Sequence, residues 1–371
     1  MTQIHTPEDL RANYEHIWST TDMRESQEYY ARCLALAKPK SGDRLLDVAC
    51  GGGYLLMEAE RAGLRPSGID IADAALARAK TFAPKSDLRR GDAEALPYPD
   101  GSFEIVTCLG SLEHFLSPPK ALEEMRRVLA PGGRAVVVVP NQWFAYDVVR
   151  GWIEGAGLSH GQESERYFSI AQARDLIGAS FAISHDEGWN PPRKLADQTR
   201  PFTGRWRAPA LRVYGWLRKR LPIAMAYVFV FVGEHAPADA PRFVDPSQGG
   251  VIPGGWNAVE GPESRWTAGR AGVWLRLGAT LHATVLHDEP GDKKLRCAIA
   301  IENEKIGETQ LAPHSWTDLD FAVPERYRGT VQRVFLEPER TWSPLDHGVR
   351  DDTRMLGLSV RRIESPSTPL A

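Results

Sequence analysis

The stretch Leu45–Gly53, read as LLDVACGGG, is a short apolar run that ends in three consecutive glycines, and a helical pattern begins after it at about Tyr54. Glycine lets the backbone come close to a ligand and adopt a positive φ angle. The helix that follows presents free N–H groups to an anionic group. The stretch therefore predicts a buried strand, a ligand-binding turn and a helix. Two other nucleotide motifs are excluded, because Leu56 stands where GxGxxG needs its third glycine and no GK[ST] of a P-loop follows.

Three carboxylates recur at the ends of successive predicted strands. Asp47 lies in the strand before the glycines, Asp70 ends the next strand in SGIDIADA, and Asp92 ends the third in GDAEALPYPDGSFEIV. In an open α/β sheet these ends line the ligand crevice, where an acid can accept both hydroxyls of a ribose. Asp92 could accept a hydrogen bond from an adenine amino group. The three acids together form a frame for an adenosine.

Helical and strand patterns alternate from residue 1 to about residue 235. Helical patterns cover about residues 25–38, 54–62, 72–81 and 119–129. Continuous apolar runs, which suit parallel strands covered on both faces, include Arg44–Val48, Glu104–Leu109 and the valine-rich Arg134–Pro140. Phe181–His185 and Ala226–Gly233 are two further candidate strands. This order predicts a doubly wound, Rossmann-like α/β sheet.

The pattern changes after a proline-rich linker at His235–Pro246. Short runs with partial alternation follow, separated by Gly, Pro, Asn and Asp turns; they are Val273–Leu277, Leu281–Leu286, Leu295–Ile301, Asp318–Val323, Val331–Leu336 and Met355–Arg362. This spacing is typical of an all-β sandwich. We therefore expect two domains, residues 1–238 and residues 239–371.

Bulk composition excludes several classes of function. The 371 residues carry a net charge of −3, which gives no electrostatic case for a nucleic-acid partner. No apolar run is long enough for a transmembrane helix, and the N-terminus does not look like a secretory signal. The four cysteines, Cys33, Cys50, Cys108 and Cys297, form no CxxC pair, which argues against a zinc site and a disulfide framework. We expect a reduced, cytoplasmic protein with no metal.

Several motifs of the first half occur in the order that is typical of one enzyme family. Residues 45–141 resemble the class I S-adenosylmethionine-dependent methyltransferases of the type 11/12 kind. The matching segments are Asp47–Gly53, Asp70, Asp92–Ala93, CLGSLEH at Cys108–His114, and RRVLAPGGRAVVVVPN at Arg126–Asn141. One departure is Ala49, which stands where the family usually has its first glycine and implies a tighter fit.

The resemblance implies that the cofactor is S-adenosyl-L-methionine. It also implies a set of cofactor-binding residues, namely Asp47, Ala49, Cys50, Gly51, Gly53, Asp70, Ile71, Asp92, Ala93 and Leu109. Tyr14 could close over the methionine end of the cofactor or serve in packing alone.

Methyl transfer to a hydroxyl benefits from a general base. His114, just past the fourth strand, is the first candidate, and its alternative role is to shape the cofactor pocket. As a base it would give a rate that rises with pH through one ionisation near neutrality. His160 is a second candidate in a predicted loop that also holds Glu163, Glu165 and Tyr167.

The second half resembles a jelly-roll-like module appended to bacterial enzymes of surface-polysaccharide biosynthesis. The matching features are a GW pair near its start, RWT, TWSP and DDTRMLGLSVRRI. Aromatic rings can stack on sugars, but large aromatics also dominate the cores of small sandwiches, and we expect three or more of its tryptophans in the core. They are Trp256, Trp266, Trp274, Trp316 and Trp342. We expect Asp351 and Asp352 to form a turn rather than a metal site.

The acceptor stays open at this point. The module favours O-methylation of a sugar of a polysaccharide or lipid-linked glycan precursor. The alternatives are a small-molecule or quinone-like acceptor with a structural β domain, and a non-catalytic carbohydrate-binding scaffold. The basic and aromatic segment Arg205–Leu221 fits either a cover helix with a solvated face or a peripheral contact with a glycolipid or the inner membrane face.

Overall fold

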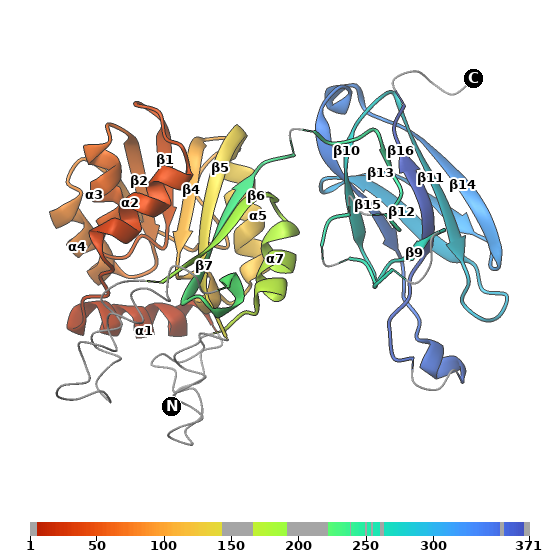
Figure 1. The fold of residues 1–371 in the computed structure, drawn as a ribbon, viewed down its shortest axis with the longest axis horizontal. Coiled ribbons are helices and arrows are strands. Elements are labelled where there is room, and N and C mark those ends of the chain that lie inside the picture. Colours follow the sequence, from red (N-terminus) through yellow and green to blue (C-terminus); the bar gives the residue numbers. More distant parts are fainter. Residues whose placement is uncertain are drawn as a thin grey trace. The chain divides into compact units, whose positions relative to one another are not determined.

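The chain forms two compact units, Met1–His235 and Ala236–Ala371. The computed structural model describes residues 6–142, 166–190, 222–237, 239–248, 251–253, 255–259, 263–348 and 352–366. The division falls inside the proline-rich linker, three residues before the end of the first domain expected from the sequence. Each unit is described separately below, and both are drawn in Figure 1.

The first unit is built on a mixed sheet of seven strands in the order β3-β2-β1-β4-β5-β7-β6. The strands are β1 (Arg44–Val48), β2 (Arg65–Asp70), β3 (Asp87–Arg90), β4 (Phe103–Leu109), β5 (Leu129–Pro140), β6 (Ala182–Trp189) and β7 (Val228–Glu234). Strands β3, β2, β1, β4 and β5 are parallel, and β7 runs antiparallel to both of its neighbours. The chain moves outward in opposite directions from β1 and β4, so the crevice at their carboxyl ends is a ligand position of this fold.

Helices cover both faces of this sheet, which confirms the doubly wound prediction (Figure 1). They are α1 (Pro7–Thr20), α2 (Gln27–Leu36), α3 (Tyr54–Arg61), α4 (Asp73–Phe82), α5 (Pro118–Val128) and α7 (Ile170–Gly178). Consecutive valines of β5 explain the two faces, since successive side chains of a strand point in opposite directions. Val136 and Val138 belong to the core under α2 and α3, whereas Val137 and Val139 belong to the core under α5 and α7.

Helix α1 was not expected from the sequence. Its start is fixed by a capping box, in which the Thr6 hydroxyl accepts from the backbone N–H of Asp9 while the Asp9 carboxylate accepts from the N–H of Thr6. Pro7 occupies the first turn, where its missing N–H costs nothing. The helix crosses the sheet edge at which β1 and β2 end (Figure 1) and contacts α4.

The second unit contains two antiparallel sheets that share one hydrophobic core. The main strands are β10 (Ala271–Arg276), β11 (Thr280–His287), β12 (Leu295–Ile301), β13 (Glu304–Leu311), β14 (Ser315–Ala322), β15 (Val331–Pro338) and β16 (Ser359–Glu364), and short ones are β8 (Phe243–Val244) and β9 (Arg265–Trp266). One sheet has the order β10-β15-β12-β13, and the other has β14-β11-β16-β8 with β9 beside β16. The all-β expectation is confirmed, and the finer jelly-roll assignment stays a prediction.

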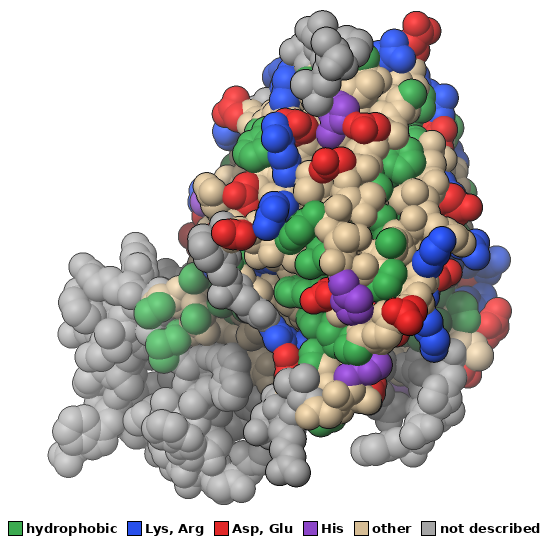
Figure 2. All heavy atoms as spheres, turned by 90° about the vertical axis from the view of Figure 1, so that its right-hand side faces the viewer, with side chains coloured by type: hydrophobic (Ala, Val, Ile, Leu, Met, Phe, Trp, Pro, Cys, Tyr) green, Lys and Arg blue, Asp and Glu red, His purple; other side chains and the backbone are tan. Residues whose placement is uncertain are grey.

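The tryptophans of this unit differ from expectation. Trp274 is buried and Trp256 packs against the core, but Trp266, Trp316 and Trp342 are half-buried, so the core holds fewer than the three or more expected. None of the five is exposed. Figure 2 shows charged side chains of both signs interspersed with apolar ones over this unit. Asp352 accepts from the Arg354 guanidinium, while Asp351 lies outside the described residues.

In the part of the chain that the structure describes, no helix has the length and apolar character needed to cross a bilayer. The predicted basic segment 205–221 lies outside the described residues. Its two alternative interpretations therefore stay predictions.

We expect the first unit to fold alone. A fragment ending at residue 238 should unfold cooperatively and keep the affinity of the full chain for its cofactor, because each unit has a hydrophobic core of its own. Thermal denaturation and calorimetry of the fragment check this. An insoluble fragment, or one that has lost the cofactor, would show that the two units depend on each other for stability.

Candidate functional site

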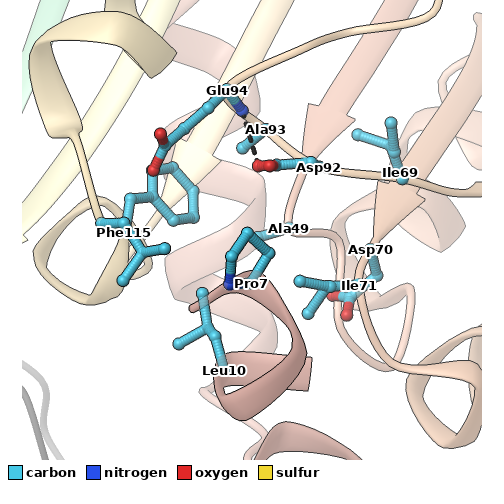
Figure 3. Close-up of a pocket in the computed structure, with 12 residues that line it drawn as sticks. Pro7, Leu10, Ala49, Ile69, Asp70, Ile71, Asp92, Ala93, Glu94 and Phe115 are labelled. Carbon is cyan, nitrogen blue, oxygen red and sulfur yellow. Dashed lines mark hydrogen bonds between the residues drawn. The ribbon is translucent and has the colours of Figure 1, made fainter. Parts of the chain in front are cut away.

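Three adjoining cavities follow the carboxyl ends of the parallel strands. The first is shown in Figure 3, where Asp70 and Ile71 face Glu94 and Phe115 across the hollow while Pro7 and Leu10 reach in from α1. Asp92 and Ala93, from the loop after β3, complete this cavity on the side away from α1. We call it the first cavity.

The second cavity continues from the first, with which it shares Leu10, Ala49, Asp70, Ile71 and Phe115. Its further lining residues are Tyr14, Trp18, Met23, Gly51, Gly110, Ser111 and His114. The third cavity adjoins the second at Met23, Gly110 and His114. Its other walls are Asp22, Arg24, Glu25, Tyr29, Tyr30, Leu109, Glu113, Val138, Pro140, Trp189, Tyr227 and Val228.

The glycine turn between β1 and α3 is the floor of the second cavity. Gly51 and Gly53 have φ angles of +51° and +75°. A Cβ on Gly51 would lie 2.4 Å from Cζ2 of Trp18, so the turn needs glycine both for its backbone and for the indole packed on it. Ala49 also has a positive φ, +56°, which explains the glycine that this position has in the family. In this chain the backbone at Ala49 is strained, because a left-handed conformation is unfavourable for alanine. Ala49 lines both the first and the second cavity.

The Asp70 carboxylate connects the turn to the end of β2. One oxygen accepts from the N–H of Gly51 at 2.9 Å, and the other accepts from the N–H of Ala72 at 2.9 Å. Burial raises the pKa of Asp70 to about 6, and these backbone donors oppose the rise. The residue lines both of the first two cavities.

Asp92 lines the first cavity from the loop after β3. Its side chain accepts from the N–H of Glu94 at 2.8 Å (Figure 3), and Glu94 in turn accepts from the N–H of Ser117 at 2.7 Å. This chain of hydrogen bonds fixes the loop against the start of α5. The sequence-predicted pair Asp92–Ala93 therefore meets Asp70 and Ile71 in one cavity.

Four other sequence-predicted residues lie elsewhere. Asp47 is buried behind the turn, accepts from Thr107 Oγ1 at 2.6 Å, and has a pKa that burial raises to about 7. Cys50 belongs to the core on the α2–α3 face, and Gly53 packs against Ala79. Leu109 lines the third cavity rather than the first two. Asp47, Cys50 and Gly53 are outside the lining of all three cavities, so their place is in shaping the turn.

Helix α1 supplies the roof that the sequence did not reveal. Trp18 is buried on the turn, and the guanidinium of Arg78 lies 5.7 Å from its ring. The Glu15 carboxylate accepts from the N–H of Ala74 at 3.1 Å, in the first turn of α4, where a negative charge is favourable. The helical spacing of Leu10, Tyr14 and Trp18 was the available signal, since these positions fall on one face.

His114 lies where the second and third cavities meet. Its ring is edge-on to Tyr14, with centroids 5.7 Å apart, and its Nε2 is 3.8 Å from Oε1 of Glu113. Its Nδ1 is buried without a hydrogen-bond partner among the described residues. Burial, with a smaller effect of Arg166, lowers the pKa of His114 to about 4, which corrects the expected ionisation near neutrality.

Arg166 is a residue that sequence reasoning missed. Its guanidinium donates to the carbonyl oxygens of Phe115 and Leu116, and its backbone N–H donates to that of Glu113. It thereby holds the loop that carries His114. The other predicted candidates, His160, Glu163 and Glu165, lie outside the described residues, and Tyr167 is described but lines none of the three cavities.

Comparison with known proteins gives a family for the first unit. The Methyltransferase domain family matches residues 46–137. A demethylmenaquinone methyltransferase of Beutenbergia cavernae is 30% identical over 161 residues, which cover 40% of this chain and 67% of that protein. The chain belongs to the S-adenosylmethionine-dependent methyltransferases. Its cofactor is S-adenosylmethionine.

Other relatives of this methyltransferase match over shorter segments. A demethylmenaquinone methyltransferase of Thermus thermophilus is 46% identical over 113 residues, 29% of this chain and 51% of that protein. A 27-O-demethylrifamycin SV methyltransferase of Amycolatopsis mediterranei is 34% identical over 134 residues, 34% of this chain and 49% of that protein. The chain thus spans about half the length of these two relatives.

Exchanging Asp47 and Asp70 for asparagine should distinguish a residue that affects stability from a residue that binds the cofactor. Asp70→Asn should weaken S-adenosylmethionine binding by about 1.5–3 kcal/mol, the range of a charge-assisted hydrogen bond, whereas Asp47→Asn should leave it unchanged. Because burial raises the pKa of Asp47 to about 7, the folded chain binds the proton more tightly than the unfolded chain, and stability falls as pH rises through 7. Asp47→Asn should therefore stabilise the protein at pH 8 by at least about 1 kcal/mol and less at pH 5.

Calorimetry with the cofactor and thermal unfolding at the two pH values check this pair. A parallel loss of cofactor affinity in both variants would place Asp47 in contact with the ligand.

The strain at Ala49 gives a second test. Ala49→Gly should raise the free energy of unfolding by about 1 kcal/mol, because the relief of a left-handed alanine exceeds the entropy that glycine adds to the unfolded chain. Ala93→Gly is the matched control, since Ala93 lines the first cavity without a positive φ, and it should lose about 0.5–1 kcal/mol. Denaturant titration measures both. Destabilisation of equal size in the two variants would contradict strain at Ala49.

Proposed function

We propose that this methyltransferase transfers the methyl group of S-adenosylmethionine to a hydroxyl group of a small acceptor in the third cavity. The observation that carries the proposal is the position of His114, a buried and neutral imidazole that lines both the second and the third cavity. Tyr29, Tyr30 and Trp189 add aromatic walls to the third cavity. Such walls suit a ring of modest size.

The first two cavities suit an adenosine and its methionine arm. Asp92 and Ala93 would face the adenine, and Asp70 would accept from the ribose hydroxyls. The methionine end would lie in the second cavity, beside Tyr14 and Ser111. When bound there, S-adenosylmethionine supplies an activated methyl group.

His114 would hold the proton that the acceptor hydroxyl releases. The His114 ring lines both the second and the third cavity, with its Nε2 3.8 Å from Oε1 of Glu113 and its Nδ1 buried. With a pKa of about 4 the imidazole stays neutral throughout the physiological range. Alignment of the acceptor oxygen with the methyl group then supplies most of the rate.

The relatives support a small acceptor. Their names specify demethylmenaquinone and 27-O-demethylrifamycin SV, and another relative is a ubiquinone biosynthesis O-methyltransferase. Polysaccharide or lipid-linked glycan O-methylation, the finer expectation from the second unit, has no counterpart among them. An occluded cofactor site would favour the scaffold alternative, whereas the first two cavities are hollow and are lined by residues that include the predicted Asp70 and Asp92.

Replacing His114 tests the proposal. His114→Ala should reduce turnover by about 10²-fold, the low end for a general base because the imidazole is a weak one, and should leave cofactor affinity unchanged. The wild-type rate should be flat from about pH 5 to pH 8, since the imidazole is neutral over this range. Transfer of labelled methyl to naphthols, methyl glycosides and primary amines measures turnover and identifies the accepted class.

His185→Ala is the matched control, because His185 is exposed on β6, lies near the carboxylate of Glu187 and lines none of the three cavities. It should keep wild-type turnover. Equal losses of cofactor affinity and turnover in His114→Ala would assign His114 to the cofactor pocket. Full turnover in that variant, with amines as the preferred acceptors, would contradict the hydroxyl proposal.

A further inference from the structure

Gly110 lies where the second cavity meets the third. It directly follows β4 and lines both cavities, as Met23 and His114 do. We call the opening that these three residues border the passage. The backbone N–H of Gly110 donates to the carbonyl oxygen of Val138 on β5 at 3.0 Å, which fixes the residue between two strand ends. A side chain at this position would therefore start from a fixed point on the rim of the passage.

The direction of such a side chain follows from its nearest neighbour. Apart from its chain neighbours, a Cβ on Gly110 would have one heavy atom of the described residues within 4 Å, Oε1 of Glu113 at 3.9 Å. The same oxygen is 3.8 Å from Nε2 of His114, and both of these side chains are less than one tenth exposed. The Cβ would therefore point toward the buried wall that Glu113 and His114 form at the passage.

Packing does not explain the glycine at this position. A Cβ on Gly51 in the same site would lie 2.4 Å from Trp18, whereas no described atom blocks a Cβ on Gly110, which is exposed. The φ angle of Gly110, +68°, favours glycine but does not exclude alanine, because Ala49 has a φ of +56°. What glycine preserves here is empty space beside His114.

We propose that Gly110 keeps the passage wide enough for alkyl groups larger than methyl, so that the enzyme also uses the S-adenosyl sulfonium compound that carries ethyl. The inference rests on the part of the proposed function that places the cofactor in the first two cavities and the acceptor in the third. The alkyl group on sulfur would then lie at the passage, beside His114.

The ethyl transfer balances as the methyl transfer does. The acceptor oxygen forms a bond to the first carbon of the ethyl group while the bond between that carbon and sulfur breaks. The electron pair of the broken bond stays on sulfur, which leaves S-adenosylhomocysteine, and the hydroxyl proton goes to His114. No further reactant is needed, so the space at the passage decides whether ethyl is accepted.

S-adenosylmethionine and S-adenosylethionine are the matched probes, because they differ by one carbon at the sulfur. Wild-type protein should bind the two with affinities within about fivefold in calorimetry, and should transfer ethyl to an acceptor that it methylates. Gly110→Ala should weaken the ethyl compound relative to the methyl compound by about tenfold, the effect of overpacking by one carbon. Gly110→Asn should do so at least as strongly, since it adds a longer side chain that tolerates a left-handed backbone.

Gly132→Ala and Gly132→Asn are the matched controls. Gly132 on β5 also has a positive φ, +77°, and a Cβ there would meet no described heavy atom within 4 Å, but the residue lines none of the three cavities. Both variants should keep the wild-type ratio of the two affinities. An unchanged ratio in the Gly110 variants overturns the inference. Wild-type protein that binds the ethyl compound more weakly than expected, or that methylates an acceptor without ethylating it, also overturns it.

The two proposals fail separately. If no hydroxyl compound is alkylated but the ratio of affinities falls in the Gly110 variants alone, hydroxyl methylation is wrong and the role of Gly110 stands. If methyl is transferred to a hydroxyl while the ratio is the same in every variant, the proposed function stands and the inference is wrong. Should the Gly110 variants not fold, as judged by thermal unfolding, the wild-type ratio of the two affinities still decides.

Discussion

The carboxylate of Asp70 is the constraint on which the site depends. By accepting from Gly51 and Ala72 it ties the glycine turn after β1 to the segment after β2. The Trp18 indole packs on this turn at Gly51, and the Glu15 carboxylate accepts from the N–H of Ala74 at the start of α4. Residues of helix α1 thereby line the first two cavities.

Burial sets the chemistry of this site more than any ion pair does. It raises the pKa of Asp47 and Asp70 to about 7 and about 6 and lowers that of His114 to about 4, so all three groups resist carrying charge. Of the two carboxylates only Asp70 lines the cavities, and the positive sulfonium of a cofactor bound there would favour its ionisation. In the proposed reaction, an acceptor hydroxyl would meet an imidazole that is already neutral.

The two units have different relations to this chemistry. The family match and all three cavities lie in the first unit. The second unit has its own core between two antiparallel sheets, with Trp274 buried in it. Two of its half-buried tryptophans, Trp266 and Trp342, pack edge-on with ring centroids 6.2 Å apart and so contribute to its packing.

The sequence by itself determined the sheet, the glycine turn and the acids Asp70 and Asp92, because local spacing places them at strand ends. It missed β13, whose polar residues hide the strand pattern. Only the tertiary structure shows that Asp47 lies outside the cavities and that Trp18 packs on Gly51. It also shows that Trp189 and His114 line one cavity. These relations join residues far apart in the chain. The low pKa of His114 has the same origin, because burial is a property of the packed chain and not of the local sequence.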